Sequence, residues 1–193
     1  MHSIDASVIE AIEFAAQRHL GQFRKGERNT PYINHPIEVV GLLVRYREHD
    51  AVLLKAAVLH DVIEDTAKTQ DEIQALAQTI EEKFGRAVLE VVREVSDDKN
   101  LPFLERKRLQ VKNTPDLSRE AKKIKIADKI CNISDMMKDP PTHWSSDRKM
   151  EYLHWAEQVI SGARGVNESL EAYFDQIRQK AHHTFTQNKK DQG

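Results

Sequence analysis

The chain has 193 residues, with 29 Lys and Arg against 31 Asp and Glu, so its formal net charge is −2 with neutral histidines. Domains usually hold roughly 100–200 residues, so this length predicts one domain with a sizeable core. The near-neutral charge argues against a protein that coats nucleic-acid polymers or binds anionic membranes. No apolar run approaches the length of about 18 residues that a membrane span needs. The single cysteine, Cys131, excludes an internal disulfide and fits a reducing, cytoplasmic compartment.

Apolar residues recur with helical spacing along nearly the whole chain. The segment 51–65 is apolar nearly all round, which is typical of a helix at the centre of a core. Residues 96–118 are expected to alternate loop and short helix, and the last helix is expected to break near Gly162 or Gly165. The predicted helices lie, in chain order, at about 8–16, 36–44, 51–65, 69–83, 88–95, 119–137 and 146–178.

The sequence contains neither strand-like alternation nor the glycine motifs of dinucleotide-binding and P-loop folds. It therefore predicts an all-α protein, a single bundle of seven to ten helices. The domain is predicted to span 1–180, and the polar residues 181–193 are predicted to form a disordered tail. His19 and His49 are expected on exposed helix surfaces, and the basic runs within 106–108 and 122–125 on solvated faces.

Four polar side chains follow the apolar run directly: His60, Asp61, Glu64 and Asp65. On one continuous helix they would span an arc of roughly 140°, with His60 stacked on Glu64 and Asp61 on Asp65. The alternative is a solvated, acidic helix end. Acids at a helix C-terminus are disfavoured by the helix dipole, which hints that a cation offsets them.

His35 lies 25 residues before His60, and Asp128 lies 67 residues after Asp61. Taken singly, His35 reads as a capping or loop residue and Asp128 as a salt-bridged helix residue. Taken with His60 and Asp61, they form a mixed nitrogen and oxygen set that suits Mn²⁺, Fe²⁺, Mg²⁺ or Zn²⁺. Such a metal lowers the pKa of water, and two acids remain for general acid/base work, Glu64 and Asp65.

The order His…His-Asp…Asp resembles the HD metal-dependent phosphohydrolase superfamily. Longer blocks, spread over about residues 8–175, resemble the hydrolase domain of the RelA/SpoT-homologue family in its stand-alone, metazoan SpoT-homologue form. The resemblance implies an all-α HD domain of about ten helices. The matching blocks are Arg24-Lys25, TPYINHP (30–36), LLKAAVLHDVIEDT (53–66), VSDDK (95–99), LERK (104–107) and KIKIADKICNI (123–133).

The resemblance also implies a reaction, the removal of pyrophosphate from the 3′ position of (p)ppGpp with one Mn²⁺ ion, other divalent metals remaining open. The ligands it implies are His35, His60, Asp61 and Asp128, and the catalytic acids are Glu64 and Asp65. Arg24 would pack on the nucleobase, although Tyr32 also offers a stacking surface. The remaining expected substrate contacts are Lys25, Lys99, Asn132, Arg148 and Tyr152.

Several alternatives stay open at this point. Ser134 stands where the family often has Arg or Lys, which leaves the nucleotide preference open. The substrate could instead be an adenine alarmone of the ppApp type, or NADPH at its 2′-phosphate, because the residue types in the matching blocks do not separate them. A non-catalytic nucleotide sensor would be expected to have lost ligands or acids. A generic HD phosphomonoesterase acting on deoxynucleotides would not need all the matching blocks. The expected partner is a small nucleotide, neither a nucleic-acid polymer nor a membrane, and the oligomeric state is open.

Overall fold

Ten α-helices and one short 3₁₀-helix make up the computed structural model, which describes residues 5–190. Over these residues, strand-like pairing is confined to an isolated antiparallel bridge between Phe23 and Pro31. The prediction of an all-α fold is thereby confirmed. The helices are α1 (Ala6–Arg18), α2 (Asn34–Arg45), α3 (Ala51–Leu59), α4 (Val62–Thr66), α5 (Gln70–Phe84), α6 (Arg86–Val95), α7 (Phe103–Asn113), η1 (Thr114–Asp116), α8 (Arg119–Lys138), α9 (Ser146–Ala163) and α10 (Glu168–Lys190).

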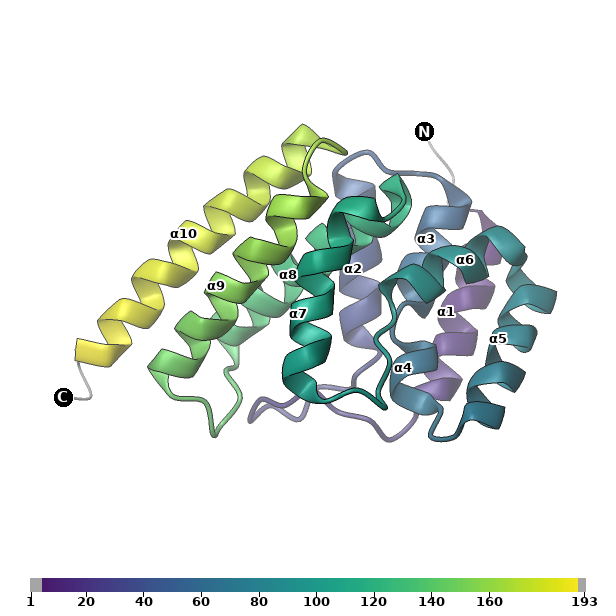
Figure 1. Ribbon diagram of the computed structural model, residues 1–193, viewed down its shortest axis with the longest axis horizontal. Helices are drawn as coiled ribbons and strands as arrows, with labels where there is room; N and C mark the ends of the chain where they lie inside the picture. Colours follow the sequence, from purple (N-terminus) through teal and green to yellow (C-terminus); the bar gives the residue numbers. More distant parts are fainter. Residues whose placement is uncertain (1–4, 191–193) are drawn as a thin grey trace.

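Three central helices separate two outer groups of helices. Figure 1 shows α9 and α10 side by side at one end of the molecule and α1, α5 and α6 at the other, with α2, α3 and α8 between them. The apolar α3 packs against α1, α2 and α6, which explains why it carries apolar residues on every side. Leu53, Leu59, Ile124 and Ile133 are fully buried where α3 and α8 form the core.

Side-chain caps fix where several helices begin. The Asp50 carboxylate accepts from the N–H of Leu53 at the start of α3. Thr69 and Glu72 form a reciprocal capping box at the start of α5. Ser118 and Ser145 accept N–H groups in the same way for α8 and α9. Two of these capped helices position predicted ligands, since α3 leads into His60 and α8 carries Asp128.

The structure corrects two predictions. The helix expected over 51–65 is interrupted at His60 and Asp61, which join α3 to the short α4. The tail expected from 181 onward is helical through Lys190, because α10 continues with Ala181 and Phe185 buried. The expected break near Gly162 or Gly165 is confirmed by the gap between α9 and α10. Residues 191–193 of the predicted tail lie outside the described residues. Within the described chain, every helix is too short or too polar to cross a membrane.

Candidate active site

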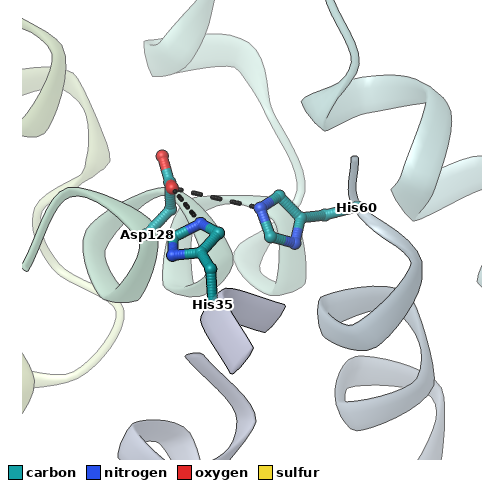
Figure 2. A group of neighbouring side chains, drawn as sticks. All are labelled: His35, His60 and Asp128. Atoms are coloured by element: carbon teal, nitrogen blue, oxygen red, sulfur yellow. Dashed lines mark hydrogen bonds and ion pairs between the residues drawn. The ribbon is translucent and has the colours of Figure 1, made fainter. Parts of the chain in front are cut away.

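Three side chains from separate elements point toward one another at the centre of the bundle. Figure 2 shows His35 from α2, His60 from the end of α3 and Asp128 from α8 converging on one point. One ligand atom from each lies within 4.8 Å of the other two. Nε2 of His35 is 3.1 Å from Oδ1 of Asp128, and Nε2 of His60 is 3.9 Å from the same oxygen. His35 and His60 are only 2% and 4% exposed, so these imidazoles are shielded from water.

Asp61 brings a second carboxylate to the two imidazoles. Its Oδ2 lies 2.9 Å from Nε2 of His60 and 3.9 Å from Nε2 of His35. Ligand atoms that are neighbours around a cation bound at about 2.1 Å are spaced about 3–3.5 Å apart. The separations between imidazole nitrogens and carboxylate oxygens in this cluster bracket that spacing.

The hydrogen bonding of His60 tests whether the cluster suits a cation. Its Nδ1 lies 2.8 Å from the carbonyl oxygen of Ala57, which fixes Nδ1 as the donor and leaves a lone pair on Nε2 of the neutral ring. This Nε2 is buried and makes no hydrogen bond within the described residues. A free lone pair facing a carboxylate needs a positive charge between them, so the donor set fits a divalent metal ion.

Electrostatics in the cluster point the same way. Burial lowers the pKa of His60, but the carboxylates of Asp61 and Asp128 outweigh it and raise that pKa to about 9. Burial would raise the pKa of Asp61, yet His60 and His35 hold it well below its usual range. Lys129 and His35 hold the pKa of Asp128 well below its usual range against the same burial effect. The site therefore attracts a cation, whether a proton or a metal.

Outer hydrogen bonds orient both carboxylates. Lys129 donates to Oδ2 of Asp128 at 2.6 Å, and Asn132 donates to Oδ1 at 2.6 Å. The Tyr32 hydroxyl donates to Oδ2 of Asp61 at 2.6 Å. Tyr32 was expected as a stacking surface for a base; it lines the cleft around the cluster, and its hydroxyl also holds a predicted ligand.

The two predicted catalytic acids share one lysine. Nζ of Lys99 lies 3.1 Å from Oε1 of Glu64 and 2.8 Å from Oδ1 of Asp65, and the backbone N–H of Asp97 donates to Oε2 of Glu64 at 3.0 Å. Burial raises the pKa of Glu64, helped by Asp61 and Asp97 and opposed by the Asp97 N–H and Lys99. Glu64 is thus suited to hold a proton.

A cleft of about 830 Å³ contains this cluster and most of the predicted substrate contacts. It is lined by Arg24, Lys25, Tyr32, Lys99, Asn132 and Tyr152 together with the predicted ligands and acids. Arg148 does not line it, but its guanidinium lies 4.8 Å from the ring centre of Trp144, which does line the cleft. NH2 of Arg24 donates to Asn132 at 2.7 Å and to Asp135 at 2.9 Å, which fixes the guanidinium against α8.

Sequence reasoning missed several residues around the cleft. Arg106 was placed on a solvated face, but its NH1 lies 3.6 Å from Oε1 of Glu64. Lys125 was placed likewise, but it is buried and donates to the carbonyl of Val95. His19 was expected to be exposed and is 3% exposed, whereas His49 is exposed as expected. The spacing of Phe103, Arg106 and Gln110 on one face of α7 was the signal that could have placed Arg106.

Known proteins resemble this chain over most of its length. A family model described as HD domain matches residues 11–153. A guanosine-3′,5′-bis(diphosphate) 3′-pyrophosphohydrolase named MESH1, from Mus musculus, is 46% identical over 178 residues, which are 92% of this chain and 96% of that protein. The Homo sapiens protein of the same name is 47% identical over 172 residues, 89% of this chain and 92% of that protein.

A solved structure is also similar. It is described as a metazoan orthologue of SpoT that hydrolyses ppGpp, and it matches with a TM-score of 0.85 and 40% sequence identity. The match covers 93% of this chain and 98% of that one. The region matched by the HD-domain model contains all four predicted metal ligands and both predicted catalytic acids.

Proposed function

Because the chain belongs to the HD-domain family and, within it, to the group that contains the MESH1 pyrophosphohydrolases, we propose that it removes pyrophosphate from the 3′ position of guanosine alarmones (p)ppGpp. The products would be GDP or GTP and pyrophosphate. The observation that carries this proposal is the convergence, in one cleft, of a cation site with two acids and a set of basic side chains.

The metal would be held by His35, His60, Asp61 and Asp128. A divalent cation bound there supplies Lewis-acid polarisation and lowers the pKa of water. Mn²⁺ is the ion we propose, since a mixed nitrogen and oxygen set suits it, and Fe²⁺, Mg²⁺ and Zn²⁺ are the competitors to be tested. The outer contacts from Tyr32, Lys129 and Asn132 keep the carboxylates aimed inward.

Hydrolysis of the 3′-pyrophosphate ester requires two proton movements. Water forms a bond to the phosphorus next to the ribose, the bond from that phosphorus to the 3′ oxygen breaks, and the 3′ oxygen leaves as a hydroxyl. One proton must therefore leave the water and one must reach the 3′ oxygen. Asp65, beside the ammonium of Lys99, is the carboxylate that accepts a proton, and Glu64, with its raised pKa, can hold one.

The rest of the cleft suits a small phosphorylated nucleotide. Lys25 and Lys99 offer ammonium groups for phosphate, and Arg24 offers a guanidinium face for a base. Asn132 lies beside Arg24, where it can contact the ribose or the base. Tyr152 lines the cleft, and Arg148 lies over Trp144, another lining residue. A cytoplasmic location is part of the same proposal, since the single cysteine is free and buried.

A panel of nucleotides tests the proposal. The protein is freed of metal with a chelator, dialysed, supplied with Mn²⁺, and incubated separately with ppGpp, ppApp and NADPH. Chromatography then separates released pyrophosphate from released phosphate. We expect pyrophosphate from ppGpp at the highest kcat/KM. Phosphate release from NADPH, with no pyrophosphate release from ppGpp, would overturn the substrate assignment. Binding of all three nucleotides without any release would favour a sensor.

A further inference from the structure

We propose that Gln22, oriented by His19, is a positioning residue for Asp65 in the reaction proposed above, on which this inference rests. Neither side chain touches the predicted metal ligands, and neither was singled out for function by the sequence. The side chains of His19 and Gln22 lie between the end of α1 and the short α4, on the side of its backbone.

The backbone around Gln22 is fixed by a tight turn at the end of α1. His19 caps this helix, and its carbonyl accepts the N–H of Gln22 at 3.0 Å. Gly21 lies between them with a φ of +76°, a left-handed conformation that favours glycine. The carbonyl of Gln22 in turn accepts the N–H of Tyr32 at 2.9 Å. The turn therefore holds the Gln22 side chain in one place relative to both α1 and the loop that leads into α2.

The Gln22 amide joins His19 to Asp65. Nε2 of Gln22 donates to the backbone carbonyl of Asp65 at 3.1 Å, and Oε1 lies 2.7 Å from Nδ1 of His19. A carbonyl only accepts, so the amide nitrogen must face Asp65 and the amide oxygen must face His19. His19 must then carry its hydrogen on Nδ1. This chain of hydrogen bonds allows one orientation of the amide.

The Asp65 carbonyl needs such a donor because α4 is very short. This helix has five residues, Val62–Thr66, and carries both acids. Isolated helices of this length do not persist in water, and the carbonyls of a last turn have no partner within their helix. Arg18 adds a contact of 3.4 Å to the Thr66 hydroxyl. The end of α1 thus caps the helix that presents Glu64 and Asp65.

His19 is placed to orient Gln22 and not to react. Its ring is 3% exposed and packs against the Tyr32 ring with centroids 4.9 Å apart. Its Nε2 is buried without a hydrogen bond within the described residues, and His19 is not among the residues that line the cleft. Tyr32 in turn donates to Asp61. Together, His19, Gln22 and Tyr32 therefore contact one predicted metal ligand, Asp61, and one predicted acid, Asp65.

The test uses a substitution that replaces the donor to Asp65 with an acidic oxygen of nearly the same size. Gln22→Glu keeps the volume and the oxygen that faces His19, but it turns a second oxygen toward the Asp65 carbonyl. The matched control is Gln78→Glu on the exposed face of α5, where the amide donates to Glu82. We expect Gln22→Glu to lower kcat about tenfold to a hundredfold while KM and bound Mn²⁺ per protein stay within about twofold of wild type. The control should retain the wild-type kcat.

A rescue experiment separates orientation from packing. Asn at position 19 can place an N–H near the position of Nδ1, so His19→Asn is expected to keep kcat within about threefold of wild type. His19→Leu fills the space without a donor and is expected to behave like Gln22→Glu. Equal losses in both His19 variants would assign His19 to packing alone and overturn its orienting role.

Amide hydrogen exchange makes the result independent of substrate. Exchange in a peptide covering 60–67 should accelerate in Gln22→Glu and not in Gln78→Glu, while peptides of α5 stay unchanged. If the wild type is active and Gln22→Glu has an unchanged kcat, the positioning role is overturned. The same holds if Gln22→Glu raises only KM at constant kcat. An inactive wild type refutes the proposed function instead, and the exchange rates then decide alone whether Gln22 holds α4.

Discussion

The hydroxyl of Tyr32 donates a hydrogen bond of 2.6 Å to Oδ2 of Asp61, so the loop before α2 fixes the orientation of a predicted metal ligand that follows α3. Burial and the nearby Asp61 charge raise the pKa of Tyr32 far above its usual value, which keeps the hydroxyl a donor at every physiological pH. The contact links two segments whose relation the sequence alone does not define.

Tyr32→Phe is expected to lower the affinity for Mn²⁺ about tenfold to a hundredfold, because it leaves the Asp61 carboxylate without its donor. Isothermal titration calorimetry of the metal-free protein measures this directly. Tyr173→Phe is the control, since Tyr173 stacks on Tyr46 at the α10 side of the molecule. An Mn²⁺ affinity equal to that of wild type would show that Asp61 does not depend on Tyr32 or does not bind the ion.

Metal binding should release a proton. In the metal-free protein the pKa of His60 is raised to about 9, so the ring is charged at pH 7 and must lose its proton to bind a metal. The apparent affinity for Mn²⁺ is expected to rise about tenfold per pH unit up to that pKa and then level off. Titrations in buffers with different ionisation enthalpies count the protons released. A pH-independent affinity would contradict the role of His60 as a ligand.

The same shift predicts how the stability of the metal-free protein depends on pH. A raised pKa means that folding favours the charged ring, so this stabilisation is complete below the unfolded pKa of about 6.5. It should be lost as the pH rises through about 9. Urea unfolding of the metal-free protein at several pH values measures the loss, and His60→Ala should abolish this pH dependence. Rising stability over that interval would reverse the expected sign.

Lys99 should control the basic limb of the pH–rate profile, because Glu64 is proposed to act in its protonated form and loses that proton as the pH rises. Its ammonium lies 3.1 Å from Glu64 and lowers a pKa that burial raises. Lys99→Met removes that charge, so the pKa of Glu64 should rise and the basic limb of kcat should move to higher pH. Lys99→Arg keeps the charge and should leave the limb near its wild-type position. A limb that stays fixed or moves downward in Lys99→Met would exclude Glu64 as the group that titrates there.

Gly26 lies where a side chain would collide with Asp139. A Cβ on Gly26 would overlap the Asp139 carboxylate, which accepts the N–H groups of Glu27 and Arg28 at 3.0 and 3.2 Å. Gly26→Ala should displace the loop that carries Arg24 and Lys25, raising KM for ppGpp about tenfold with a smaller effect on kcat.

Gly41→Ala provides the matched control for that experiment. A Cβ on Gly41 meets nothing within 4 Å, and Gly41 lies on the exposed face of α2. Alanine there should stabilise the protein by about 0.5–1 kcal/mol and leave KM unchanged. Gly26→Ala with a wild-type KM would show that the loop does not depend on this close approach.

Much of the fold could be predicted from the chain because helical spacing reports burial directly. The limits appear at particular residues. Nothing in the run that ends at His60 marks a break, since the sequence there has neither glycine nor proline, yet the chain turns at Asp61 to aim its carboxylate at two imidazoles. At the other end, polar residues obscured an apolar stripe through Phe174, Ala181 and Phe185, which keeps α10 on the bundle.

In the candidate site, too, some residues could be predicted from the sequence and others could not. The resemblance of the blocks around His35, His60 and Asp128 to the HD family implied that these three converge, and they do. The supports could not be predicted, because they depend on contacts between distant segments. Gln22 reaches Asp65 across 43 positions, and Arg24 reaches Asp135 across 111. Residue type and spacing carry no signal for such pairs.

Metal reconstitution in wild type and Asp65→Asn tests whether hydrolysis needs both the metal and Asp65. Both proteins are freed of metal, supplied with Mn²⁺, and assayed for pyrophosphate released from ppGpp and for bound metal. We expect Mn²⁺ to restore pyrophosphate release in wild type, and Asp65→Asn to bind Mn²⁺ equally without turning over ppGpp. Undiminished release by metal-free wild type, or by Asp65→Asn, would contradict a metal-dependent hydrolysis that uses Asp65.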